Sequence, residues 1–228
     1  MNLGDHVNDQ PQDVTANRRD LQLATGVAAV YLSQVHGNQV VELSASSAMG
    51  QPADACFTDQ PGLACCIMVA DCLPVLLSDR QGTFVAAAHA GWRGLAGDGM
   101  PTGQGVLAAL MAQLRRKKLL GQANDTSNLI AWLGPCIGPD AFEVGLEVKQ
   151  AFEKQASLKA DCFKSAGSMK WRADLAGLAR HELMALGVKD IFGNDSSPTW
   201  CTVSNPSRFF SYRRDGLTGR MAALVWRV

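Results

Sequence analysis

The chain has 228 residues, of which 47% are hydrophobic, so it is long enough to bury one sizeable core. Its 21 basic and 21 acidic residues balance, which excludes the broad positive field of a protein that binds nucleic acid or anionic lipid and leaves a small molecule as the expected partner. The longest apolar stretch, 63–77, is interrupted by Asp71 and Pro74, so no membrane-spanning segment is expected.

The amino-terminal residues, MNLGDHVNDQ, are polar and carry an acidic residue early, unlike a secretion signal or a membrane anchor. This start looks disordered, and it contains His6. The chain has seven cysteines, an odd number, and Cys65 and Cys66 are adjacent. We therefore expect reduced thiols and a cytoplasmic location rather than a disulfide framework.

Short apolar runs predict strands in the first half of the chain. Residues 27–43 predict two short strands around a Gly-Asn turn. The run 64–70 fits a strand that is buried on both faces. Residues 73–77 and 83–88 predict neighbouring strands joined by a turn at 79–82.

Apolar residues at helical spacing predict two amphipathic helices in the second half. One spans 103–118 and has a basic run in its last turn, where cations suit the helix dipole. The other spans 173–186, with Asp174 near its start and His181 expected on its surface. Residues 208–228 are expected to form two strands around an Asp-Gly turn.

These elements alternate without a strict β-α-β rhythm. They predict an α+β fold, a layered sandwich of mixed β-sheets with flanking helices. No repeat or linker divides residues 1–228, so we expect a single domain. Oligomeric state is left open between a monomer and a small homo-oligomer, because no coiled coil is visible.

Three residues with metal-binding side chains lie where predicted strands end. His36 stands in QVHGN, Cys72 in MVADCLPVLL and His89 in VAAAHAGWRG. Two imidazoles and a thiolate suit zinc and leave a coordination position for water or substrate, and copper would bind the same set more tightly. Neither interval is a compact zinc-finger spacing, so an alternative stays open: Cys72 and His89 could form a thiolate–imidazole nucleophile pair.

Residues that flank these positions are candidates for a pocket. Asp71 could orient a metal ligand or simply end a strand. Gly91 and Gly94 allow close backbone approach beside Trp92, a candidate pocket wall, although a plain turn would also need glycines. Arg93 is either a phosphate ligand or a partner in a surface salt bridge.

Two later segments add further candidates. In LGPCIGP, Cys136 is either a packing thiol, a second reactive sulfur or a fourth metal ligand. In FFSYRRDG, Phe210 and Tyr212 could stack on a base and Arg213 could bind an anion, although a strand with a charged hairpin tip would give the same pattern.

Seven stretches occur in order across most of the chain: QVHGNQVV, ADACFTDQPG, VADCLPVLLSD, AAAHAGWRGL, AWLGPCIGP, AFEVGLEV and FFSYRRDGLTGRMA. Together they resemble the laccase-domain family of purine nucleoside phosphorylases, also described as polyphenol oxidases. The resemblance implies a layered fold with mixed sheets and a zinc on His36, Cys72 and His89. Members usually have some tens of residues before the Asn-Leu-Gly segment, so the chain is expected to lack that amino-terminal part.

The resemblance also implies chemistry. Members cleave adenosine with phosphate to adenine and ribose 1-phosphate, act on inosine and methylthioadenosine, and deaminate adenosine to inosine. Zinc would polarise a substrate oxygen or lower the pKa of a bound water. Arg93, Cys136 and Arg213 are the catalytic candidates, and Trp92, Phe210 and Tyr212 the candidates for substrate binding.

Three rival functions are weighed against this one. Multicopper oxidation needs several copper ions held largely by imidazoles, which four histidines cannot supply. A cysteine-dependent hydrolase would use Cys72 and His89 without metal. A zinc-stabilised interaction domain would bind metal without converting any nucleoside, and Cys136 would then be the fourth ligand of a structural zinc site.

Overall fold

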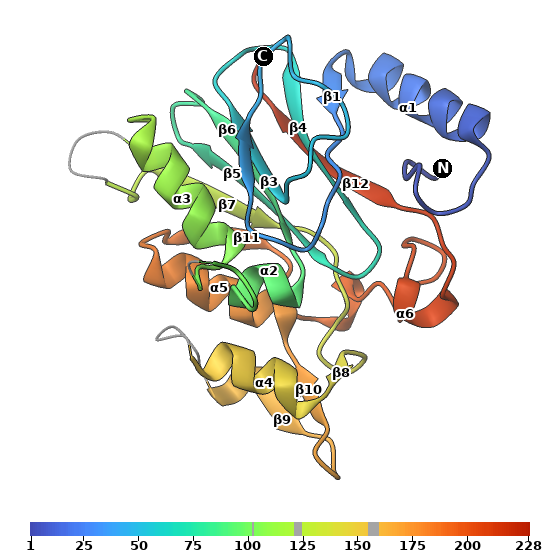
Figure 1. The fold of residues 1–228 in the computed structure, drawn as a ribbon, viewed down its shortest axis with the longest axis vertical. Helices are drawn as coiled ribbons and strands as arrows, with labels where there is room; N and C mark the ends of the chain where they lie inside the picture. The colour runs from blue at the N-terminus through green and yellow to red at the C-terminus, as the bar shows by residue number, and fades with distance from the viewer. Residues whose placement is uncertain (102, 121–124, 155–159) are drawn as a thin grey trace.

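The computed structural model describes residues 1–101, 103–120, 125–154 and 160–228. Among them no helix is long and apolar enough to cross a membrane. The elements form stacked layers, with a six-stranded sheet at the centre (Figure 1). The expected α+β sandwich of mixed sheets with flanking helices is confirmed.

The central sheet has the strand order β11-β7-β5-β6-β3-β2 and mixes parallel with antiparallel pairs. Its strands are β2 (Val40–Glu42), β3 (Ala55–Thr58), β5 (Leu73–Asp79), β6 (Val85–Ala90), β7 (Leu129–Leu133) and β11 (Asp190–Gly193). The predicted neighbours 73–77 and 83–88 are the antiparallel hairpin β5–β6. A smaller sheet combines β8 (Glu143–Val144), β9 (Phe163–Ser165) and β10 (Trp171–Ala173).

Side-chain alternation along the strands divides the interior into two cores. On β6, Ala86 and Ala88 face the helices, whereas Val85 and Ala87 face the second sheet. That second sheet contains β1 (Ala28–Val30), β4 (Leu63–Val69) and β12 (Met221–Trp226), with β4 in the middle. β4 is buried along its whole length, as its apolar sequence predicts.

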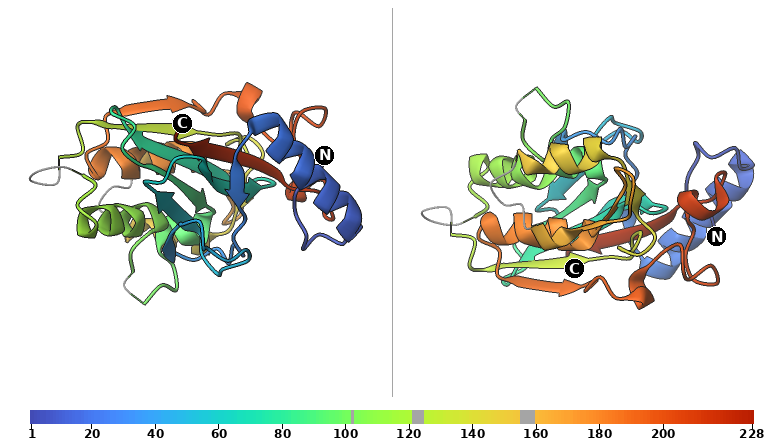
Figure 2. Two further views of the ribbon diagram at one scale, coloured as in Figure 1. Left: turned by 90° about the horizontal axis from the view of Figure 1, so that it is seen from above. Right: turned by 90° about the horizontal axis from the view of Figure 1, so that it is seen from below.

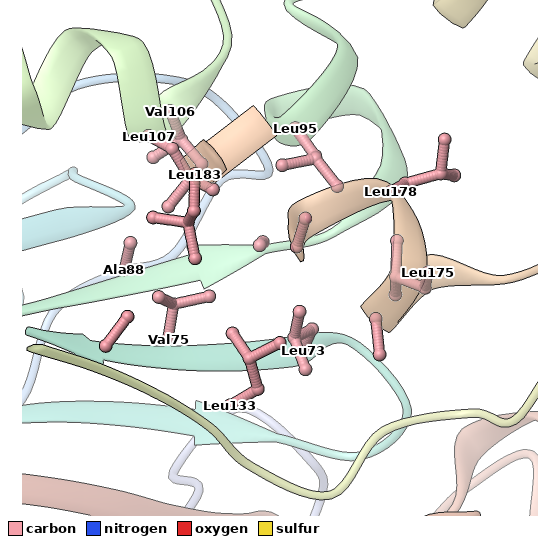
Figure 3. Packing of buried hydrophobic residues seen from close by; sticks show 14 of the residues in the cluster. Leu73, Val75, Ala88, Leu95, Val106, Leu107, Leu133, Leu175, Leu178 and Leu183 are labelled. Atoms are coloured by element: carbon pink, nitrogen blue, oxygen red, sulfur yellow. The ribbon is translucent and has the colours of Figure 1, made fainter. Parts of the chain in front are cut away.

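Helices cover the outer faces of both sheets (Figure 2). On the central sheet lie α2 (Trp92–Ala96), α3 (Val106–Arg116) and α5 (Leu175–Ala185), whereas α4 (Leu146–Glu153) packs against α2 and the small sheet. Figure 3 shows the packing of Leu107 and Leu183 from α3 and α5 above Val75 and Ala88 of the sheet. Helix α1 (Pro11–Thr25) covers the outer face of β1, β4 and β12.

The prediction was wrong at both ends of the chain. The start is not disordered: Asn2 is buried, and Leu3 N donates to the Arg220 carbonyl over 3.0 Å. At the other end, residues 208–228 form one strand, β12, preceded by the short helix α6 (Tyr212–Asp215) instead of a second strand. Ser211 caps α6, because its hydroxyl accepts a hydrogen bond from Arg214 N over 3.2 Å.

Candidate active site

The three predicted metal ligands meet. The donor atoms of His36, Cys72 and His89 all lie within 4.8 Å of one another. Cys72 Sγ is 3.7 Å from His36 Nε2, and the two imidazole rings stand edge to face with centroids 4.8 Å apart. His89 is buried and His36 is exposed, so the cluster opens to solvent on one side.

The β5–β6 hairpin explains why two of these residues meet. In its register Pro74 pairs with His89, so the start of β5 lies beside the end of β6. Cys72 is two residues before Pro74 and therefore on the same face of the sheet, diagonally across from His89. The third ligand, His36, comes from the connection between β1 and β2.

Asp54, which the sequence analysis did not select, joins the loop that carries His36 to His89. Its fully buried carboxylate accepts a bond from His89 Nδ1 over 2.8 Å and from the backbone N–H groups of Val35, His36 and Gly37 over 3.2, 2.9 and 2.7 Å. With Nδ1 engaged, His89 presents Nε2 to the cluster. The only signal in the sequence was its place in ADACFTDQPG.

Electrostatics favour the thiolate form of Cys72. Burial by itself would raise the pKa of this thiol, but His89 and His36 outweigh that effect and lower the pKa to about 6. Burial opposes protonation of His89, yet Cys72 and Asp54 raise its pKa to about 9. A metal ion that binds here would use the thiolate and displace the remaining ring proton of His89.

Backbone geometry around the cluster is tight and partly strained. His36 has a left-handed backbone with φ 59°, and Asp71, next to Cys72, has φ 106°. A Cβ on Gly91 would lie 3.0 Å from His36 Cδ2 and 3.1 Å from Cys72 Sγ, and one on Gly94 only 2.7 Å from the Gly37 carbonyl oxygen. The close approach expected at both glycines is therefore observed.

The cluster lies in a cavity of about 400 Å³. Four further predicted site residues line it: Trp92, Arg93, Tyr212 and Arg213. The remaining lining residues are His6, Gln34, Met68, Val69, Ala70, Asp71, Ile137, Phe142, Leu175 and Arg220. The structure therefore brings together seven of the nine predicted site residues.

The two predicted arginines line this cavity and come from two different helices, α2 and α6. Arg93, at the start of α2, stacks its guanidinium over the Trp92 ring at 4.5 Å. Arg213, on α6, donates from one guanidinium nitrogen to the Glu143 carbonyl over 3.0 Å. Both side chains keep further N–H groups for an anion.

The two roles left open for Asp71 are resolved by its contacts. Its carboxylate accepts a bond from Thr202 Oγ1 over 2.5 Å and from Arg213 N over 2.7 Å. Its carbonyl accepts from Ile137 N over 2.8 Å. Asp71 therefore ties the loop after β7 and helix α6 to the Cys72 segment, and its carboxylate does not bond to a metal-ligating side chain.

Arg220 is a second residue that the sequence analysis missed, although it stands in the quoted GLTGRMA. It lines the cavity, and its backbone is held by Asn2 and Leu3. Burial lowers the pKa of its guanidinium, an effect that Cys72, Asp71 and Tyr212 oppose. With Arg93 and Arg213 it gives the cavity three guanidinium groups.

Cys136 and Phe210 do not line this cavity. Cys136 is buried behind the wall, and its sulfur accepts a bond from Asn194 Nδ2 over 3.3 Å. Burial raises the pKa of its thiol well above the ordinary value. The Phe210 ring packs on Gly219, where a Cβ would lie 2.8 Å from ring atom Cζ.

A second cavity, of about 500 Å³, lies beside β12. Its walls are mostly apolar and include Trp132, Arg208 and Phe209. It contains none of the predicted site residues and no candidate metal ligand. The smaller cavity is therefore the candidate active site.

Comparisons with known proteins identify the family of the chain. A family model described as multi-copper polyphenol oxidoreductase laccase matches residues 1–228. The chain is 43% identical over 230 residues to purine nucleoside phosphorylase YfiH of Escherichia coli, covering all of this chain and 86% of that protein. It is 46% identical over 227 residues to a purine nucleoside phosphorylase of Pseudomonas aeruginosa, covering 99% of this chain and 85% of that one.

Solved structures show the same fold. A Neisseria meningitidis protein superimposes with a TM-score of 0.84 at 44% identity, covering 99% of this chain and 86% of that one. A hypothetical protein YfiH of Bacillus licheniformis superimposes with a TM-score of 0.88 at 26% identity, covering 100% and 85%.

Proposed function

The chain belongs to the family described as multi-copper polyphenol oxidoreductase laccase, and from its relatives' names and its own site we propose that it is a zinc-dependent purine nucleoside phosphorylase. The proposed reaction converts adenosine and phosphate to adenine and ribose 1-phosphate, and inosine and methylthioadenosine are further substrates. Adenosine deamination to inosine is proposed at the same site. The observation that carries the proposal is a cluster of metal ligands in one cavity with three arginine side chains.

The donor set fits zinc. One thiolate and two imidazoles are ligands that zinc accepts, and the Asp54 bond leaves Nε2 of His89 free to ligate. His36, Cys72 and His89 would hold the ion. When bound, it supplies Lewis-acid chemistry, which polarises an oxygen or lowers the pKa of a water.

The arginines would bind the phosphate. In phosphorolysis a phosphate oxygen forms a bond to the anomeric carbon of the ribose, the bond to the base breaks, and the leaving base takes up a proton. Arg93, Arg213 and Arg220 would hold the anionic nucleophile and offset its charge. Each guanidinium is held by its own contact: Arg93 by the Trp92 ring, Arg213 by the Glu143 carbonyl and Arg220 by the Thr218 carbonyl. Phosphate would therefore bind a preformed site.

Aromatic side chains would hold the nucleoside. Tyr212 lines the cavity and is 62% exposed, so its ring is free to stack on a purine. Trp92 would form the opposite wall, with Arg93 stacked on it. Cys136 and Phe210 would support the walls from behind.

Multicopper oxidation has weaker support than the family description suggests. The chain has four histidines in total, and His36 and His89 already belong to one cluster. The other two, His6 and His181, pair with Asp5 and Asp161. A single copper at the His36 cluster remains compatible with the donor set.

A cysteine-dependent hydrolase is the second candidate, because Cys72, His89 and Asp54 are arranged like a nucleophile, its base and an orienting carboxylate. A strong chelator distinguishes the two functions. The chelator should abolish phosphorolysis. A thiol hydrolase should stay active in the chelator and should be inactivated by iodoacetamide. Replacing His36 with alanine is a further test, because only the metal-dependent reaction needs this side chain.

The decisive experiment incubates the zinc-loaded protein with adenosine, with and without phosphate, and identifies the products by chromatography. Adenine that appears only with phosphate supports phosphorolysis, and inosine with ammonia supports deamination. Arg213→Gln should raise the KM for phosphate, and Arg80→Gln, on an exposed residue that pairs with Asp190, is the matched control. Intact adenosine with zinc bound at the His36 cluster would refute the proposal and favour an interaction domain.

All seven cysteines are unpaired. A reducing, cytoplasmic location is therefore part of the proposal.

A further inference from the structure

A second group of metal-binding side chains lies away from the cavity. Asp161 and Cys162 belong to the 3₁₀ turn η2 (Ala160–Cys162), which leads into β9, and His181 lies on α5. Their donor atoms all lie within 4.8 Å of one another, as in the first cluster. None of the three lines the candidate active site.

The fold fixes the positions of these residues. The Cys162 carbonyl accepts a hydrogen bond from Asp174 N over 2.9 Å, and the next residue, Phe163, pairs with Ala173 across the small sheet. The Cys162 side chain packs in the main hydrophobic core. The thiol is therefore held against α5 by backbone hydrogen bonds and by packing.

His181 was expected on the helix surface, but its side chain is only 22% exposed. Its Nε2 lies 3.8 Å from Asp161 Oδ1. In a tetrahedral zinc site, an oxygen and a nitrogen ligand with bond lengths of about 2.0 to 2.2 Å are separated by about 3.3 to 3.5 Å. The carboxylate and the imidazole are within a few tenths of an ångström of this separation.

The surroundings of the thiol are negatively charged. Asp161 and Asp174 both act electrostatically on Cys162. The carboxylate of Asp174 is engaged in capping α5, where it accepts a bond from Gly177 N over 2.9 Å. Asp161 is the most exposed of the three donors and leaves a path from solvent to the cluster.

We propose that Asp161, Cys162 and His181 form a second divalent-metal site, of the zinc class, that fastens the start of β9 to α5. A mixed set of sulfur, nitrogen and oxygen donors suits zinc better than magnesium or calcium, which require oxygen ligands. Binding releases the thiol proton to solvent, and water occupies the remaining position. The site does not depend on the proposed catalytic function.

Metal counting tests the proposal. The protein is stripped with a chelator under reducing conditions, loaded with Zn²⁺, desalted and measured by mass spectrometry of the metal. The wild type should retain two equivalents, and His181→Gln should lose one of them while its circular dichroism stays unchanged. Arg80→Gln is the control and should retain both equivalents, because Arg80 also pairs with an aspartate, Asp190, but lies outside both metal clusters and outside the candidate active site.

Cobalt identifies the ligands. In a Cys72→Ser background, Co²⁺ should still give a thiolate-to-metal absorption band, and adding His181→Gln should abolish it. A zinc content that His181→Gln leaves unchanged, or a thiolate-to-Co²⁺ band that persists when Cys72→Ser and His181→Gln are combined, would overturn the proposal. Both results are independent of whether adenosine is turned over.

Discussion

Replacing Asp54 with asparagine tests whether one buried carboxylate positions the metal ligands. Its Oδ1 accepts bonds from His36 N and His89 Nδ1, and its Oδ2 accepts from Val35 N and Gly37 N. Asparagine has the same shape but turns one oxygen into an N–H donor, which then faces two other donors. Two donors lose their acceptor in either orientation of the amide.

Both orientations harm the metal site. If the amide nitrogen faces His89, Nδ1 must accept a bond, and the ring proton moves to Nε2, the atom that ligates metal. If the nitrogen faces the Val35 and Gly37 backbone, the loop that carries His36 loses its anchor. Zinc affinity should fall about 10- to 100-fold, the range for groups that orient a ligating histidine.

Stability should fall as well. Each stranded donor costs about 1–3 kcal/mol, so the fold loses about 1–3 kcal/mol if His89 Nδ1 becomes an acceptor and about 2–6 kcal/mol if two backbone N–H groups are stranded. At about 2–4 °C per kcal/mol for a chain of this size, the Tm should drop by about 2 °C or more. Part of this loss disappears if the loop relaxes and its N–H groups reach water.

Zinc competition with a chromophoric chelator measures the affinity, and calorimetry measures the Tm. Asp79→Asn is the matched control: Asp79 also accepts two bonds, from Thr83 N and Thr83 Oγ1 over 2.7 and 2.6 Å, but at the other end of β5. It should lower the Tm and leave zinc affinity within about twofold. Equal zinc affinities for Asp54→Asn and wild type would refute the positioning role.

Three further predictions concern the same cavity. Arg220→Gln should raise the KM for phosphate about tenfold or more with a smaller change in kcat, because a charge-assisted bond contributes about 1.5–3 kcal/mol. Steady-state kinetics measure both constants. An unchanged KM would show that Arg220 does not bind phosphate. Gly94→Ala should lower both Tm and zinc affinity, because its Cβ would press on the Gly37 carbonyl and displace the His36 loop, at a cost of about 1–3 kcal/mol. Removal of metal by a chelator should lower the Tm, and added zinc should raise it again in a concentration-dependent way. At a zinc concentration about a hundredfold above Kd, the free energy of unfolding should rise by about 2.7 kcal/mol. A Tm that does not change with zinc would contradict a site formed by folding.

The sequence predicted elements whose apolar pattern is strong and local. Helix α3 has five buried residues at helical spacing, and β4 is apolar throughout. Helix α1 was missed because only Val14 of its 15 residues is buried, so no apolar stripe marks it. Its available signals were Pro11 at the start and Gly26, left-handed at φ 73°, after the end.

The carboxy-terminal error has a long-range cause. An Asp-Gly pair favours a hairpin only if the flanking residues find strand partners. Here Arg214 donates to the carbonyls of Thr202, Val203 and Phe209, and Arg213 N donates to Asp71, so the segment forms a helical turn. Contacts between residues as distant as 71 and 213 leave no periodic trace in a single sequence.

The same limit explains which site residues were found. Cysteine and histidine at strand ends stand out by residue type, so the metal cluster was predictable. Asp54 and Asp71 are ordinary carboxylates in the sequence, and their importance comes from the backbone N–H groups that folding brings to them. Each acts as an acceptor that fixes a loop.

These two aspartates divide the positioning of the site between them. Asp54 fixes the loop that carries His36, the first proposed metal ligand, and Asp71 fixes the turn that carries Arg213, a proposed phosphate ligand. The ligands they serve are far apart in the chain, so the unfolded chain has no preformed site, and metal binding stabilises the folded state alone. A substitution at Asp71 should therefore change phosphate binding more than zinc binding, because the Asp71 carboxylate bonds to the turn that carries Arg213. A substitution at Asp54 should change zinc binding more than phosphate binding, because the Asp54 carboxylate bonds to the loop that carries His36.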